Sequence, residues 1–188
     1  NNAAARETFS KSIRPLWEME TPAMNEKVAG KKVWDGNLVD GDTLLSDGSS
    51  IIDAVAIKDK KRLASMKNGE KKFPEDKIKS GYWDEITKGS GESLNELGSV
   101  QIDTKGIPVD VAILTTKSGD VLPLSAKRLR FIQSVTGATE IRKLSFKDMG
   151  VFYRDGKAVA AIMPFGKAPD IDLDVARAAV ARARPPTP

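Results

Sequence analysis

The stretch 109–137, VDVAILTTKSGDVLPLSAKRLRFIQSVTG, holds the clearest structural pattern in this chain of 188 residues. Two runs rich in apolar and β-branched residues flank the turn dipeptide Ser118-Gly119, a pattern typical of a hairpin with strands at 109–116 and 121–124. A helix is expected over 125–135, because its first residue is a serine, a favoured N-cap, and a glycine follows its end.

Within this helix, Leu129 and Ile132 share one face with Phe131 beside them, so the helix should pack an apolar face against the hairpin. Further strands are expected on both sides of this unit, at 32–34, 43–45, 50–57, 100–104, 142–146, 151–154 and 158–163. Short strands, tight turns and a packed helix predict an α+β fold with a mainly antiparallel, twisted sheet, hairpins and a few packed helices.

The stretch 50–69 leaves two interpretations open. Either a strand ends at Ile57 and a helix capped by Asp59 follows, or a single helix starts at Ser49 or Ser50. Further helices are expected over 3–17, from Pro74, and over 170–184, where acids in the first turn and arginines in the last suit the helix dipole.

The domain organisation follows from these elements. We expect residues 1–30 to form a linker or an N-terminal helical extension. Residues 31–166 should form a single α+β domain, with a loop boundary near 89–91 where glycine and serine cluster. Residues 167–188 should form a C-terminal helix followed by a Pro-rich tail.

The chain has no histidine and no cysteine. This excludes Ser-His and Cys-His nucleophiles, disulfides and thiolate or imidazole metal sites. Catalysis would have to use carboxylates, Lys, Tyr, Ser or Thr, and neither GxGxxG nor GxxxxGK[ST] is present to hold a nucleotide phosphate. The sequence therefore favours a noncatalytic protein with no cofactor and no metal site.

Positive charge is concentrated in residues 117–147, where seven Lys and Arg face two acids. Because such a surface attracts phosphates, we expect it to bind nucleic acid. The residues expected to make these contacts are Lys127, Arg128, Arg130, Arg142, Lys143 and Lys147. The alternative is a solvated helix face. A second basic run, 58–72, is interrupted by acids and is typical of ordinary surface; the two runs together on one face would form a larger footprint.

A metal-dependent hydrolase is an alternative function. Asp103 and Lys105 form an Asp-x-Lys pair after a predicted strand, and Asp84 or Glu85 could supply an earlier carboxylate. Two carboxylates and a lysine can hold Mg²⁺ and orient a water molecule. A simple strand end before a turn explains the same residues.

The hairpin 151–164, VFYRDGKAVAAIMP, resembles a hairpin in accessory modules of the very large polyvalent proteins of phages and mobile elements. Such proteins are thought to enter a new host with phage or plasmid DNA and to act there against its defences. The resemblance implies that the chain is a module of a larger protein, and it assigns no catalytic residue.

The leading hypothesis is a noncatalytic binding module of a larger protein, with DNA or RNA as partner. The alternatives are a protein-interaction or self-assembly domain, which would use a strand edge or the helix at 170–184, and the Mg²⁺-dependent hydrolase. No apolar run approaches the roughly 20 residues of a membrane span, so we expect a soluble protein with no membrane partner. The absence of cysteine fits a cytoplasmic location, and the sequence leaves the oligomeric state open.

Overall fold

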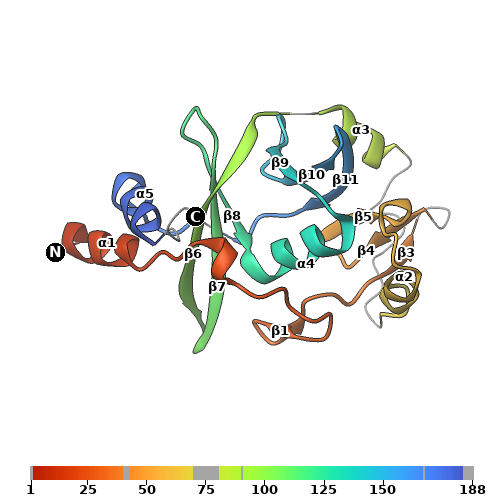
Figure 1. Cartoon of the computed structure of the whole chain (residues 1–188), viewed down its shortest axis with the longest axis horizontal. Helices are drawn as coiled ribbons and strands as arrows, with labels where there is room; N and C mark the ends of the chain where they lie inside the picture. Colours follow the sequence, from red (N-terminus) through yellow and green to blue (C-terminus); the bar gives the residue numbers. More distant parts are fainter. Residues whose placement is uncertain (1, 40–42, 70–80, 90, 167, 184–188) are drawn as a thin grey trace, which may run out of the picture.

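The structure, a computed structural model, describes residues 2–39, 43–69, 81–89, 91–166 and 168–183 (Figure 1). Its strands are β1 (Lys27–Val28), β2 (Lys31–Lys32), β3 (Asn37–Val39), β4 (Leu44–Ser46), β5 (Ser50–Asp53), β6 (Ser93–Thr104), β7 (Ile107–Thr115), β8 (Val121–Ser125), β9 (Glu140–Lys143), β10 (Gly150–Arg154) and β11 (Lys157–Ile162). In the described residues, β1 and β2 form a small hairpin, and the other nine strands form one antiparallel sheet. Its order is β3-β4-β5-β11-β10-β9-β6-β7-β8.

The described helices are α1 (Asn2–Lys11), α2 (Lys60–Met66), α3 (Tyr82–Lys88), α4 (Ala126–Thr136) and α5 (Leu173–Arg182), with 3₁₀ turns η1 (Leu16–Glu18) and η2 (Ala54–Ala56). Figure 1 shows α1 and α5 side by side at one end of the molecule, α4 near the middle, and α2 and α3 toward the other end. This arrangement confirms the predicted α+β fold with a mainly antiparallel sheet. No helix in the described part of the chain is long and apolar enough to cross a membrane.

The stretch 109–137 folds as its local signals predict. Gly119 takes a positive φ of 98° in the turn between β7 and β8, a conformation that glycine adopts without strain. The Ser125 hydroxyl accepts a hydrogen bond from the backbone N–H of Arg128 at the start of α4, and Gly137 closes the helix in the left-handed region. The apolar face of α4 packs against β7, β8 and β11, and its Leu129 is fully buried.

The sheet changes partners along β6. Ser93 and Leu94 pair with β9, whereas the rest of the strand pairs with β7, and a register shift lies between Glu96 and Gly98. A Cβ on Gly98 would lie 2.6 Å from the backbone oxygen of Arg14, so glycine permits the N-terminal segment to approach here. Arg14 and Ser99 exchange two backbone hydrogen bonds of 2.9 and 2.7 Å at this point.

The helix expected over 3–17 ends at Lys11, because the following residues leave the helix to pair with β6. Ile13 and Leu16 then enter the main hydrophobic cluster. At the other end of the chain, α5 packs on α1 and β6 and buries Ala176. The N-terminal and C-terminal segments thus share contacts with the same strand.

Several element boundaries differ from the expectations. The single helix proposed for 50–69 is wrong, because β5 ends at Asp53 and the Asp59 carboxylate caps α2 by accepting the N–H groups of Lys61 and Arg62. Strand β9 begins and ends earlier than 142–146, β6 begins at Ser93, and β3 was not expected. The helix expected from Pro74 lies outside the described residues.

Burial of Leu129 provides a test of the α4 packing. Replacing Leu129 by alanine removes apolar contacts and leaves a cavity, so we expect Leu129→Ala to lower the free energy of unfolding by about 2–5 kcal/mol. Ser134→Ala, at an exposed position on the same helix, should change it by less than about 0.5 kcal/mol. Urea unfolding followed by circular dichroism measures both, and equal midpoints would contradict this packing.

A polar cluster connects β6 and β9 where the sheet changes partners. The Glu140 carboxylate accepts hydrogen bonds from Arg142 Nε (2.7 Å) and Nη2 (3.1 Å) and from the Ser93 hydroxyl (2.8 Å). The hydrogen bonds from Arg142 and, after them, the one from Ser93 lower the pKa of Glu140. The same pair raises the pKa of Arg142, and the Arg142 guanidinium also lies 4.1 Å from the centre of the Tyr153 ring.

Because the pKa of Glu140 is lowered in the folded state, its contribution to stability is present at neutral pH and is lost as the pH falls through that lowered value. We expect Glu140→Gln to destabilise the protein at pH 7 by about 0.2–1 kcal/mol, the range of partly exposed ion pairs. Thermal unfolding should show this difference shrinking toward about pH 3. Glu20→Gln, at an exposed residue without an ion pair among the described residues, is the control. A pH-independent difference would show that the charge of Glu140 does not matter.

Candidate functional site

The basic residues that the sequence placed on one surface lie on different elements, namely α4 and the strand β9 with the loop after it. In Figure 1 the ribbon of β9 lies above that of α4, and the bases of the two elements have different partners. Acids also neutralise several of them. Lys127 Nζ lies 2.8 Å from a Glu26 carboxylate oxygen, and Lys143 Nζ lies 3.4 Å from one of Asp148. Arg142 is held by Glu140, as described above.

The remaining three residues of the predicted set differ from one another. Arg130 donates from Nη2 to the Met19 carbonyl oxygen (3.4 Å), and Lys147 is exposed near the end of the β9–β10 loop. The guanidinium of Arg128 has no hydrogen bond or ion pair with any described residue, and its Nε is buried. Arg128 is therefore the base of α4 with the greatest capacity to bind a ligand.

Arg128 faces a hollow that it shares with the β1–β2 hairpin. This hairpin hollow has a volume of about 480 Å³. It is lined by Lys27, Gly30, Lys31, Lys32, Asp35, Asp47, Ser49 and Arg128. The tight turn through Ala29 and Gly30, which have φ values of 50° and 81°, brings the lysines on its two sides together. Four cations from two parts of the sequence therefore meet at one hollow.

The two acids of the hairpin hollow already have partners. Asp47 is buried, and its Oδ1 accepts hydrogen bonds from the N–H and hydroxyl groups of Ser49 and Ser50, at 2.9 to 3.2 Å. Asp35 also has an interaction. Asp47 forms no ion pair with a described residue, and neither do the four cations.

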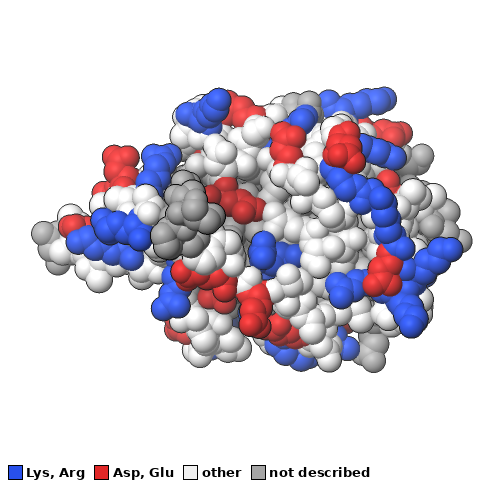
Figure 2. Space-filling view, viewed as in Figure 1, with Lys and Arg blue, Asp and Glu red and all other residues white. Residues whose placement is uncertain are grey.

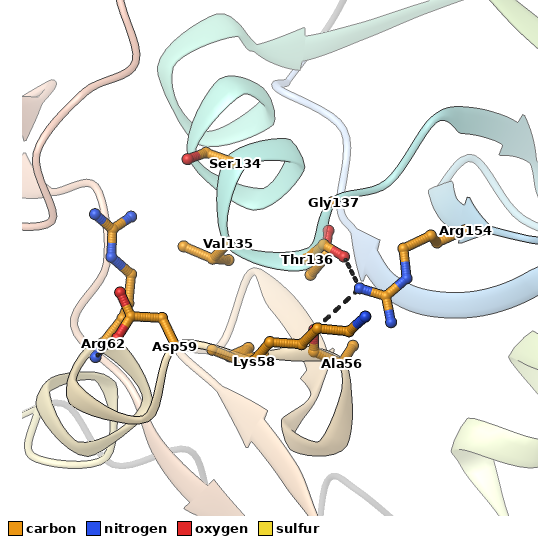
Figure 3. A pocket seen from close by; sticks show the side chains of 10 residues that line it. Ala56, Lys58, Asp59, Arg62, Ser134, Val135, Thr136, Gly137 and Arg154 are labelled. Atoms are coloured by element: carbon orange, nitrogen blue, oxygen red, sulfur yellow. Dashed lines mark hydrogen bonds between the residues drawn. The ribbon is translucent and has the colours of Figure 1, made fainter.

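A second hollow, the Arg154 hollow, lies between α2, the C-terminal end of α4 and the end of β10 (Figure 3). Its volume is about 340 Å³. It is lined by Ala56, Ile57, Lys58, Asp59, Arg62, Ser134, Val135, Thr136, Gly137 and Arg154. Nη1 of Arg154 donates to the carbonyl oxygens of Thr136 (2.8 Å) and Ala56 (3.4 Å), which fixes the guanidinium at one side of the hollow.

The basic residues around α2 extend between the two hollows. A smaller hollow of about 130 Å³ is lined by Lys32 and Asp35 of the hairpin hollow and by Ser65 and Asn68 at the end of α2. Lys60, Lys61 and Lys67 are exposed on or next to this helix. Figure 2 shows basic and acidic side chains interspersed over much of one face, with basic side chains gathered around α2.

The residues of the hydrolase hypothesis are not brought together. Asp103 and Lys105 lie in the hairpin that joins β6 to β7, and Lys105 has a positive φ of 51° in its turn. Asp84 and Glu85 lie on α3, toward the other end of the molecule in Figure 1. No group of three or more acids that could hold a metal ion is present among the described residues.

The sequence analysis did not predict a binding role for several residues that line these hollows. Lys27, Lys31 and Lys32 surround an Ala-Gly dipeptide, and this tight-turn signal could have predicted their convergence. Arg154 was expected only as the end of a strand. No local signal predicts its meeting with Lys58, because the two residues belong to elements that are far apart in the sequence.

Comparison with known proteins gives no further assignment. No protein-family model, no curated protein and no solved structure matches this chain. The resemblance of the hairpin 151–164 to modules of polyvalent proteins therefore stays a prediction. The hairpin itself is present as β10 and β11, joined by the turn at Asp155 and Gly156.

Proposed function

We propose that this chain is a noncatalytic module that binds nucleic acid through a basic band around the β1–β2 hairpin and α2. The band consists of Lys27, Lys31, Lys32, Lys60, Lys61, Lys67 and Arg128. The observation that carries the proposal is the convergence on the hairpin hollow of four cations that form no ion pair with a described residue. The resemblance of the hairpin 151–164 agrees with it, since polyvalent proteins travel with DNA.

The chemistry of the band suits a phosphate backbone. Lysines on exposed positions attract phosphates without reading bases, so the binding should be strong in low salt and should tolerate different sequences. Arg128 differs from the lysines because its planar guanidinium can donate two hydrogen bonds to one phosphate. The hairpin hollow therefore supplies a fixed contact, and the lysines of α2 extend the positive surface beyond it.

The helix at 170–184, which was the alternative protein contact, is less available than expected. Just before α5, the N–H of its N-cap residue Asp172 donates to the Ser10 hydroxyl of α1 (2.7 Å), and Arg6 contacts Asp170 (3.2 Å). One face of α5 is thus occupied by α1 and β6. Its use for self-assembly would require a different face, so the basic band is the stronger candidate.

Charge reversal tests the basic band. We expect Lys31→Glu/Lys32→Glu to weaken binding of a labelled oligonucleotide by at least about tenfold in low salt, because two attractive charges become repulsive. The slope of log affinity against log salt should also decrease by about 2, or about 1 for each lost phosphate contact. Fluorescence anisotropy with single-stranded and double-stranded DNA and RNA, at several salt concentrations, measures both quantities.

The matched control is Lys88→Glu/Lys147→Glu, which makes the same charge change at exposed lysines on α3 and the β9–β10 loop. We expect this variant to bind within about twofold of the unmodified chain. The comparison is made at a salt concentration that screens the effect of the changed net charge. Equal losses in the two variants would contradict a localised band. Absence of binding to every oligonucleotide in low salt would overturn the proposal in favour of a protein partner.

A further inference from the structure

We propose that the Arg154 hollow is a separate binding site for a phosphate monoester in its dianionic form. Arg154 and Lys58 would hold the phosphate, Arg62 would add positive charge from the opposite side, and the apolar lining would contact the organic group that carries the phosphate. This site uses different residues from the basic band, and its occupation does not require that the chain binds nucleic acid.

The guanidinium of Arg154 is positioned before any ligand arrives. Its Nη1 is bound by the carbonyl oxygens of Thr136 and Ala56, and a Cβ on Gly137 would lie 3.4 Å from its Cδ. Its Nε and Nη2 have no hydrogen-bond partner among the described residues. A guanidinium that is fixed and still has free donors loses little freedom when it binds an oxyanion.

Two like charges approach one another at one side of the hollow. In Figure 3 the amino group of Lys58 extends toward the guanidinium of Arg154, whereas the guanidinium of Arg62 lies at the opposite side, beyond Asp59. The Arg62 guanidinium carbon lies 5.9 Å from the centre of the Phe131 ring, a contact that holds the side chain beside α4. None of these cations forms an ion pair with a described residue. An anion between Lys58 and Arg154 would offset the repulsion between these two cations.

The charge of the hollow suits a dianion. Asp59 is the acid among the described lining residues, and its Oδ1 is used as the N-cap of α2. Three cations and one acid leave two positive charges to compensate. A phosphate monoester carries close to two negative charges at neutral pH, whereas an internal phosphodiester carries one and needs two exits for its chain.

The size and the lining of the hollow suit a monoester larger than inorganic phosphate. Its volume of about 340 Å³ lies within the range of sites for small molecules. Ile57 and Val135 are buried apolar residues at its wall, and Ala56 lies beside them. These side chains can contact a sugar or another organic group, and the cations fix the phosphate end.

Nuclear magnetic resonance of the full chain tests the site. At constant ionic strength, inorganic phosphate and adenosine 5′-monophosphate should shift the Gly137 amide and the Arg154 Nε–H signals in a saturable way. Sodium chloride and adenosine should not, because they lack the phosphate dianion. Shifts that grow linearly without saturation, or that chloride reproduces, would overturn the proposal.

The pH dependence identifies the charge of the bound phosphate. The dianion of a phosphate monoester takes up one proton near pH 6 and becomes a monoanion. The ionisable groups that face the hollow are Lys58, Arg62, Arg154 and the N-cap carboxylate Asp59. The chain has no histidine that could titrate in the same range. Affinity for adenosine 5′-monophosphate should therefore fall several-fold from about pH 7.5 to about pH 5.5. Equal affinity at the two pH values would contradict binding of the dianion.

Lys58→Gln is the principal variant, because Lys58 is exposed and no described residue depends on it. We expect it to weaken adenosine 5′-monophosphate binding by at least about fivefold, since a charge-assisted contact is lost. Lys60→Gln removes the same charge from an exposed position on α2 that does not line the hollow, and it should leave the affinity unchanged. Equal losses in both variants would show unspecific attraction and overturn the site. Arg154→Gln should abolish saturation, with its fold checked by the dispersion of the amide signals.

A final comparison identifies whether the monoester is a nucleic-acid strand end or a free small molecule. It also separates a failure of this proposal from a failure of the nucleic-acid proposal. If the ligand is a strand end, a 5′-phosphorylated oligonucleotide should bind several-fold tighter than its 5′-hydroxyl form, and Lys58→Gln should abolish this difference. If the ligand is a free monoester, adenosine 5′-monophosphate should still saturate the site while the two oligonucleotides bind equally. The variant Lys31→Glu/Lys32→Glu should retain binding of the monophosphate. Loss of monophosphate binding in that variant would overturn the independence of the two sites.

Discussion

The rest of the structure depends on the change of partner along β6. The strand pairs with β9 at Ser93 and Leu94 and with β7 from Asn95 onward, and a register shift lies between Glu96 and Gly98. The N-terminal segment packs on β6 at this point, where Arg14 approaches Gly98. Helix α4 packs against strands from both parts of the sheet, β7 and β11. The main hydrophobic cluster consequently includes residues from Ile13 to Ala176.

Local sequence signals were sufficient to predict the elements of the stretch 109–137. They were insufficient to predict where β6 and β9 pair. A turn, an N-cap and a helical repeat act between residues only a few positions apart, so they can be read directly from the sequence. The first residues of β6 carry no such signal. Ser93 becomes part of a strand because it pairs with Arg142, and that partner is known only after the fold has formed. Strand β9 was misplaced by two or three residues for the same reason.

The basic surface shows the same limit. A charge count over a window of sequence assumes that neighbouring bases act together, but Lys127 pairs with Glu26 whereas Lys143 pairs with Asp148. The count included Arg128, which lines the hairpin hollow, but also Lys127, which Glu26 neutralises. It could not include Arg154, because the hydrogen bond from Arg154 to Ala56 connects residues 98 positions apart. Composition was the more reliable guide, since the absence of histidine and cysteine holds for any fold.

The pairing of α1 with α5 determines where mechanical load enters the molecule. Arg6 and Ser10 of α1 contact the residues just before α5, so the first and last described helices lie together at one end of the molecule. A force that pulls these two helices apart would act first on the contacts between them. The strands around α4 would carry little of that force at first. Both basic hollows lie outside this path, so a tether at either end would leave their geometry intact until the α1–α5 pair had opened.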